Sequence, residues 1–241
     1  KSESQAFFDI YHERFISVLI GLLTILYVFK WSKELYGFPA GCFSLFLSCL
    51  SPNLIAYSQF VSTDIYAAFF SIALFYHTWK YSRDQSLKQL ILLAVFLALC
   101  EVSKQALLFY YFIIPLILII VHYSNKKSRD SALNDKDHSF KNWIIWKILL
   151  VAAINLFIIN AAFLFFKTGM PLNKYHFISQ SFQDIQKSFS FIWNIYLPLP
   201  EPFLSGMDAA KYFEQLGGGF PQSSYPNVYL LGQAKQNGFF W

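Results

Sequence analysis

Four ionisable residues stand at the ends of long apolar segments of this chain. Two are cations, Arg14 and Lys104, two are carboxylates, Asp64 and Glu101, and His12 lies close to Arg14. A charge near hydrocarbon is costly, so it usually pairs or faces a polar cavity. Together, the cations could hold a phosphate through charge-assisted hydrogen bonds, and a carboxylate could accept a proton from a hydroxyl group. The alternative is that each residue is an interfacial anchor at a helix end.

The segment 51–64 separates two apolar segments and carries several of the candidate residues. It holds the helix-breaking Pro52, a run of small polar side chains, Tyr57 and, near its end, Asp64, and it has no Lys or Arg. Pro52 is predicted to kink or end the preceding helix. We therefore predict that 51–64 is a loop at one surface of a membrane, where Asp64 is the candidate catalytic residue and Tyr57 a candidate binding residue.

The composition indicates a membrane protein. Of the 241 residues, 56% are hydrophobic and 14% are charged, whereas soluble domains carry about 25% charged residues. The net charge of +5 does not indicate a nucleic-acid partner, because the cations fall between apolar segments rather than on one face. No His and Asp residues have the spacing of metal ligands, so the sequence identifies no certain cofactor, and a divalent metal ion would be compatible with the site.

The apolar segments predict an all-α, polytopic bundle of about six transmembrane helices. The polar patch 101–105 interrupts a stretch too long to cross a bilayer as one helix, which predicts a hairpin there. We divide the chain into a transmembrane domain, 1–166, and a Gly-, Pro- and Tyr-rich segment, 167–241, in which 177–196 has the pattern of an amphipathic surface helix. The predicted spans are 15–31, 40–56, 65–79, 87–102, 106–121 and 143–166.

The distribution of cations predicts how the spans are oriented. The cations that follow spans one, three and five far outnumber Lys104, the single cation in the two loops on the other side. Because basic loops stay in the cytoplasm, we predict that Asp64, Lys104 and 167–241 lie on the exoplasmic side of the plasma (inner) membrane. The basic side comprises Lys30, Lys33, Lys80, Arg83, Lys88, Lys126, Lys127, Arg129, Lys136, Lys141 and Lys147.

Several short motifs occur in the order seen in one enzyme superfamily. The motifs are 33–37, Ala40-Gly41, 51–58, Thr63-Asp64 and 103–105, and two later segments, 197–206 and 229–241, also match. In this order they resemble polytopic glycosyltransferases of the C-type fold, in the superfamily of dolichyl-phosphate-mannose protein mannosyltransferases and aminoarabinose (lipid A) transferases. The resemblance covers most of the chain.

The resemblance implies an enzyme that moves a sugar from a polyprenyl-phosphate carrier, with inversion, to a lipid, glycan or protein acceptor on the exoplasmic face. It implies that Asp64 matches an acidic site near the acceptor or phosphate. Lys104 matches a cation near the carrier phosphate, and Arg14 a frequent arginine. At position 59 this chain has glutamine where many members have arginine, and Glu101 has no clear counterpart in the family. The family's principal catalytic acid would precede residue 1, so we expect the sequence to be an internal fragment.

Two other classes of membrane protein fit parts of the pattern. A secondary transporter would also place charges in the membrane, but it predicts inverted repeats and charges near the centres of spans. The charges here lie at span ends and no repeat is visible. A non-catalytic subunit of a membrane complex would use 167–241 as a docking surface.

Overall fold

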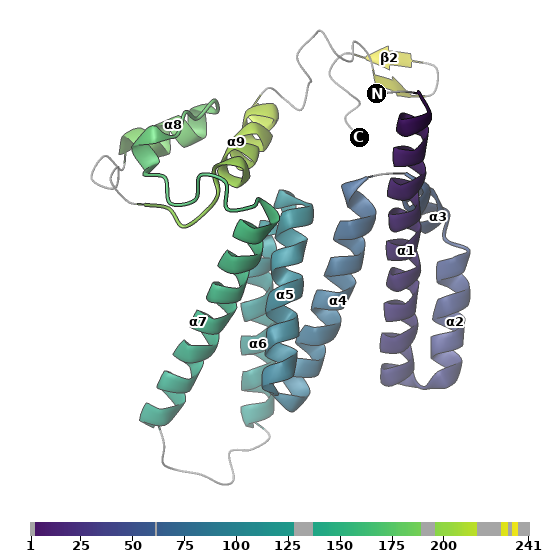
Figure 1. The fold of residues 1–241 in the computed structure, drawn as a ribbon. Helices are drawn as coiled ribbons and strands as arrows, with labels where there is room; N and C mark the ends of the chain where they lie inside the picture. The colour runs from purple at the N-terminus through teal and green to yellow at the C-terminus, as the bar shows by residue number, and fades with distance from the viewer. Residues whose placement is uncertain are drawn as a thin grey trace. The chain divides into compact units, whose positions relative to one another are not determined.

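The computed structural model describes residues 3–60, 62–127, 137–188, 196–215, 228–230 and 233–235, and the side chains of 14–60, 62–121, 145–172, 174–188 and 196–215. It divides the chain into two units, 1–158 and 159–241. Nearly all of the regular structure is helical, which confirms the predicted all-α class (Figure 1). The exception among the described residues is a short antiparallel pair, β1 (Val228–Leu230) and β2 (Gln233–Lys235).

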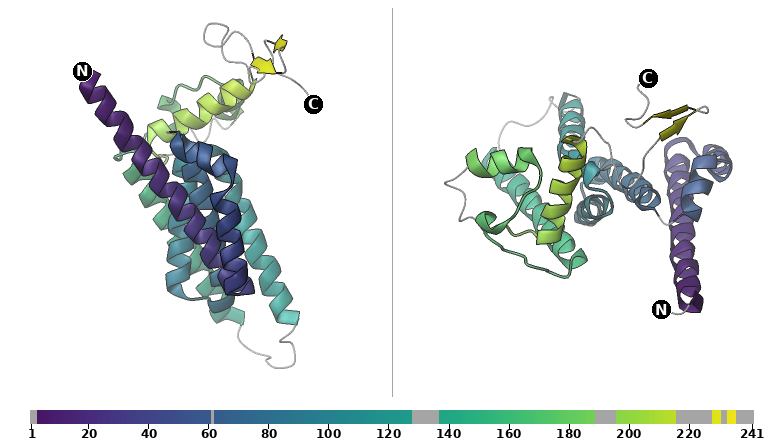
Figure 2. Two further views of the ribbon diagram at one scale, coloured as in Figure 1. Left: turned by 90° about the vertical axis from the view of Figure 1, so that its right-hand side faces the viewer. Right: turned by 90° about the horizontal axis from the view of Figure 1, so that it is seen from above.

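The first unit begins with a long helix and a tight turn. Helix α1 (Glu3–Tyr36) packs against α2 (Phe38–Cys49) and α3 (Pro52–Gln59), which lie beside it in Figure 2. Gly37 makes the turn with φ of 92°, a conformation that side chains with a Cβ atom rarely adopt, and a proline lies in the first turn of α2. Gly37 and the following proline thus end one helix and begin the next.

Helices α2 and α3 are separated by a break next to Pro52, where the sequence predicted that the helix would kink or end. The two helices are bent by 58°. The prediction that all of 51–64 is a loop is wrong, however, because most of it forms α3. The Ser51 side chain caps this helix by accepting a hydrogen bond from the Leu54 N–H, and Pro52 occupies its first turn, where no N–H donor is needed.

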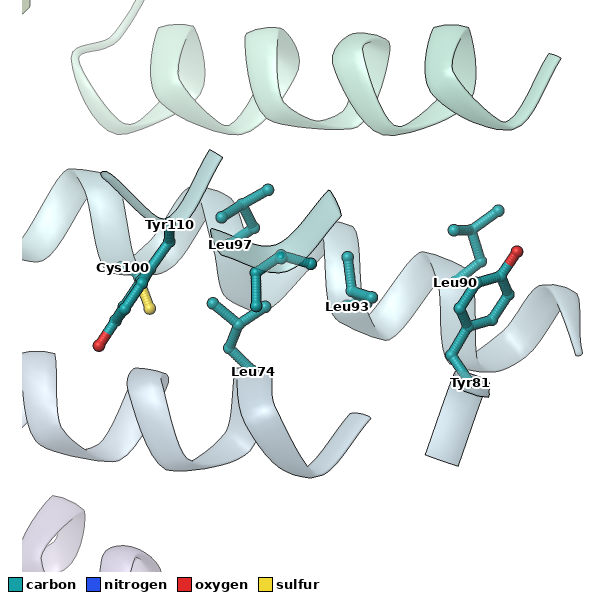
Figure 3. Packing of buried hydrophobic residues seen from close by; sticks show 8 residues of the cluster. Leu74, Tyr81, Leu90, Leu93, Leu97, Cys100 and Tyr110 are labelled. Carbon is teal, nitrogen blue, oxygen red and sulfur yellow. The ribbon is translucent and has the colours of Figure 1, made fainter. Parts of the chain in front are cut away.

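The rest of the first unit is a set of antiparallel helices. After α4 (Thr63–Asp84) and α5 (Leu87–Ser103), the chain breaks at Lys104 and makes a 3-10 turn, η1 (Gln105–Phe109), before α6 (Tyr110–Lys127). The hairpin predicted at 101–105 is thus confirmed. Helix α7 (Asp137–Ala162) follows. The core lies between α4, α5 and α6 and includes Leu74, Leu93, Leu97, Cys100 and Tyr110 (Figure 3).

A hydrogen-bond network ties α7 to the core. The Asn155 amide donates to the Ala94 and Val151 carbonyls at 3.4 and 2.7 Å, and it accepts from the Tyr111 hydroxyl at 2.7 Å. Asn155 therefore links α7 to α5 and α6. Asn160 does not: its side chain donates to the Pro198 carbonyl and accepts from Thr168, both within the second unit.

Two described helices are long and apolar enough to cross a membrane: 14–36 of α1 and 145–162 of α7. The bent pair α2 and α3 adds a third if it counts as one span. Helix α5 has 17 residues, about 26 Å at 1.5 Å per residue, which is short for a hydrocarbon core of about 30 Å. The structure confirms the membrane class, and the count of six spans stays a prediction.

The second unit contains two helices joined by side-chain contacts. A 3-10 turn, η2 (Leu172–Lys174), precedes α8 (Gln180–Ser188), and α9 (Glu201–Gln215) follows. The helix predicted over 177–196 begins three residues later than expected, and 189–195 lies outside the described residues. Asp208 of α9 accepts hydrogen bonds from the Ile178 and Ser179 N–H groups just before α8, and the Ser179 hydroxyl accepts from the Phe182 N–H of its first turn.

Candidate functional site

An ion pair joins α4 to the break after α5. The Lys104 ammonium lies 2.7 Å from Asp64 Oδ1, and the two side chains are 46% and 42% exposed. Asp64 lies in the first turn of α4, where a carboxylate is favoured by the positive end of the helix dipole. The backbone of Lys104 is extended. Its N–H donates a hydrogen bond to the Cys100 carbonyl, and its carbonyl accepts one from the Leu107 N–H. The backbone is therefore held in place at both residues, while the charged ends of both side chains are accessible to solvent.

A cavity of about 460 Å³ opens beside this ion pair. Asp64 and Lys104 line it together with Tyr57, and Ile65 and Ala68 give it an apolar wall. Asn53 and Leu54 of α3 complete the lining. The structure thus brings together three residues that the sequence singled out, from three separate elements.

Asn53 is a lining residue that the sequence analysis missed. It stands four residues before Tyr57, so both side chains lie on the same face of α3. The four-residue spacing between Asn53 and Tyr57 could have indicated a shared face, but only if the segment is helical. Reading 51–64 as a loop removed that information.

The remaining candidates lie apart from the cavity lining. Arg14 is exposed on α1, one turn before Ser17, which contacts the Tyr66 hydroxyl at 3.3 Å. Arg14 is therefore at the same end of the unit as Asp64. For His12 only the backbone, in α1, is described.

Glu101 is inside the protein rather than at the cavity. It is 1% exposed, and neither carboxylate oxygen has a hydrogen-bond partner among the residues that the structure describes. Glu101 is not among the residues that line the cavity, so a phosphate bound at the Asp64–Lys104 pair would not contact its side chain. Glu101 as a candidate substrate- or phosphate-binding residue stays a prediction.

Replacing Glu101 by methionine should stabilise the protein. A buried polar group without a partner costs about 1–3 kcal/mol, and methionine has a similar length without that group. We expect a higher midpoint of thermal unfolding in detergent. Glu101→Gln is the matched control, because it keeps a polar head and should give no such gain. A midpoint for Glu101→Met at or below that of the wild type would contradict the described surroundings of Glu101.

The close approach of α1 and α3 sets the position of the cavity wall. A Cβ atom at Gly21 would lie 2.8 Å from the Ser58 Cβ, nearer than two such atoms can stay. Ser58 is in α3, one residue after Tyr57. Any side chain at Gly21 must therefore move the helix that carries the lining residues.

Gly21→Ala should displace α3 and lower activity together with stability. Overpacking of this kind costs about 1–3 kcal/mol. Thermal unfolding and the rate of the catalysed reaction are the two measurements. In the double variant Gly21→Ala/Ser58→Gly the clashing atom is gone, so we expect activity to recover. If the double variant is no better than the single one, the contact between Gly21 and Ser58 is not the cause.

Comparison with known families identifies the class of protein. A family model described as dolichyl-phosphate-mannose-protein mannosyltransferase matches residues 8–134, more than half of the chain. The chain belongs to this family. The matched region contains every candidate residue named above, and it supports the resemblance read from the motifs. Searches of curated proteins and of solved structures gave no match.

The family and the apolar helices together establish a membrane glycosyltransferase of the mannosyltransferase type. Within the described part of this transferase, no three His, Cys, Asp or Glu side chains lie close enough to hold a metal ion. The polar groups of its cavity are instead one ammonium, one carboxylate, one amide and one phenol. This set suits an anionic phosphate beside a hydroxyl-rich ligand.

Proposed function

We propose that this mannosyltransferase takes its sugar from a polyprenyl-phosphate carrier and that the Asp64–Lys104 cavity binds the carrier phosphate. The observation that carries the proposal is the exposed ion pair at the cavity. The exposed pair itself stabilises the protein by about 0–1 kcal/mol. A hydrogen bond to a charged group contributes about 1.5–3 kcal/mol, so a phosphate can recruit Lys104 at small cost.

The ammonium group can serve two partners at once. It has three N–H donors, of which Asp64 uses one. An oxygen of the bound phosphate accepts a hydrogen bond from a second N–H, and the positive charge of Lys104 then interacts with both the phosphate and Asp64. Binding of the phosphate thereby weakens the hold of Lys104 on Asp64 and frees the carboxylate for a second task.

The reaction follows from these two charges. The acceptor oxygen attacks C1 of the sugar from the face opposite the phosphate, which inverts that carbon. The bond between C1 and the phosphate oxygen breaks, its electron pair leaves with the phosphate, and Lys104 stabilises the added negative charge. Asp64 accepts the proton of the acceptor hydroxyl. The acceptor lies on the exoplasmic side and is a lipid, a glycan or a protein.

A transfer assay on the full-length protein in proteoliposomes tests the proposal. Polyprenyl-phosphate-mannose and a nucleotide-linked mannose are offered separately, with membrane extract as the source of acceptors. Asp64→Asn and Lys104→Ala should each lose most of the transfer. The controls Asp84→Asn and Lys88→Ala remove the same charges at the opposite ends of α4 and α5, and they should keep it.

Two outcomes would contradict the proposal. One is direct use of the nucleotide-linked sugar in place of the lipid-linked donor. The other is unchanged transfer in both Asp64→Asn and Lys104→Ala. If the isolated product retained the sugar's anomeric configuration, only the inverting step would be contradicted, not the use of the lipid-linked donor. Solute exchange without any lipid-linked sugar would favour a transporter instead.

A further inference from the structure

A cluster of aromatic rings lies at the end of α1 and α4 that is opposite the cavity. It consists of Trp31 from α1 and of Tyr76 and Trp79 from α4. The ring centres are 6.1 to 6.4 Å apart, so the three rings form one contiguous cluster, in which the Tyr76 ring is buried. We call it the aromatic triad.

Three cations lie over the aromatic triad. The Lys30 and Lys80 ammonium groups are 5.1 and 5.8 Å from the centre of the Tyr76 ring, and the Arg83 guanidinium is 4.6 Å from that of Trp79. Cations are attracted to ring faces at these distances, and each contact holds a flexible side chain in place. The triad therefore gathers positive charge that would otherwise spread apart.

One carboxylate partly neutralises this charge. Glu34 pairs with Lys80 at 2.9 Å and accepts a hydrogen bond from the Tyr76 hydroxyl at 2.8 Å. Within the described residues, Lys30 and Arg83 form no ion pair with a carboxylate. The Trp31 indole N–H is also buried without a hydrogen-bond partner there. Two cations therefore remain available to an anion, whereas the buried indole N–H does not.

An apolar stripe leads away from this cluster along α1. Leu22, Leu26 and Lys30 follow one another at four-residue spacing, so they lie on the same face of the helix. Leu22 and Leu26 are 53% and 55% exposed. A cation at the end of an exposed leucine stripe is the arrangement expected where a lipid head group meets its acyl chain.

We propose that the aromatic triad with Lys30 and Arg83 binds the head-group phosphate of an anionic phospholipid, whose acyl chain lies along Leu22 and Leu26. The site is separate from the Asp64–Lys104 cavity, so the inference does not depend on the proposed donor. A lipid fits better than a free anion because the apolar stripe continues from the charged group. Its occupant joins the ends of α1 and α4.

Binding of phosphatidylglycerol to the full-length protein in neutral detergent tests this site, with phosphatidylcholine as the zwitterionic comparison. Each basic residue near an anionic lipid contributes about 1 kcal/mol, which is roughly a fivefold change in affinity. We expect Lys30→Gln/Arg83→Gln to weaken binding of phosphatidylglycerol by about 30-fold. Lys88→Gln, the control outside the triad, should change it by less than about threefold.

A second variant separates binding from folding. Lys30→Arg/Arg83→Lys keeps both charges, and we expect it to bind within about threefold of the wild type. Three results would overturn the proposal. They are wild-type affinity in Lys30→Gln/Arg83→Gln, equal affinity for phosphatidylcholine, and displacement of the lipid by inorganic phosphate at constant ionic strength. The last result would identify a site for free anions.

Discussion

Lys104→Ala should lower kcat/KM for the lipid-linked donor by about 10²- to 10³-fold. Loss of one preorganised group at the atom where negative charge develops costs about 2.7–4 kcal/mol in the transition state, and Lys104 is the cation at the cavity. The bound phosphate is charged before the reaction as well, so part of the loss should appear as a higher KM. Initial rates across a range of donor concentrations measure both effects.

The comparison with Lys104→Arg sharpens this prediction. Arginine keeps the charge and should retain more activity than alanine, although its planar group donates in different directions. Lys88→Ala, at the other end of α5, should leave kcat and KM unchanged. A drop of the same size in Lys104→Ala and Lys88→Ala would mean that net charge matters and that the position of Lys104 does not.

Asp208→Ala should unfold the second unit locally. Asp208 is 2% exposed and accepts from the Ile178 N–H at 2.6 Å, the Ser179 N–H at 3.0 Å and the Ser179 hydroxyl at 2.5 Å. The variant leaves these donors without their acceptor, and each buried donor costs about 1–3 kcal/mol. We expect a loss of about 3–5 kcal/mol.

Hydrogen exchange resolved by segment is the suitable measurement for Asp208→Ala. Exchange should accelerate over 177–188, while the amides of α4 and α5 keep their protection. Glu214→Ala is the control, because Glu214 is exposed on the same helix and its ion pair within the described part of the chain is with Lys211, three residues earlier. Its effect should stay below about 0.5 kcal/mol. Unchanged exchange over 177–188 in Asp208→Ala would refute the stabilising role of this carboxylate.

The sequence predicted the helical class and the main breaks for physical reasons that are local. Gly37 ends α1, Pro52 separates α2 from α3, and the polar patch before Gln105 interrupts a stretch too long for one helix. Each of these signals acts through the backbone of its own residue or its nearest neighbours.

Features that depend on distant partners could not be read in this way. At the start of α8 the Ser179 hydroxyl accepts from the Phe182 N–H and donates to Asp208, a residue of another helix that spacing within 177–196 could not indicate. Glu101 and Lys104 are three residues apart at the same helix end, yet one is buried and the other faces a cavity. That difference depends on which face of α5 packs against its neighbours. The side of the membrane on which the cavity opens stays a prediction from the basic loops.

Affinity for polyprenyl phosphate without a sugar tests the central claim most directly. The carrier phosphate alone should compete with the lipid-linked donor, because the claim is that Lys104 binds this group. Lys104→Ala should weaken its binding by about 10-fold or more, and Lys88→Ala should not. Equal affinity of the wild type and Lys104→Ala for polyprenyl phosphate would contradict the assignment of the cavity.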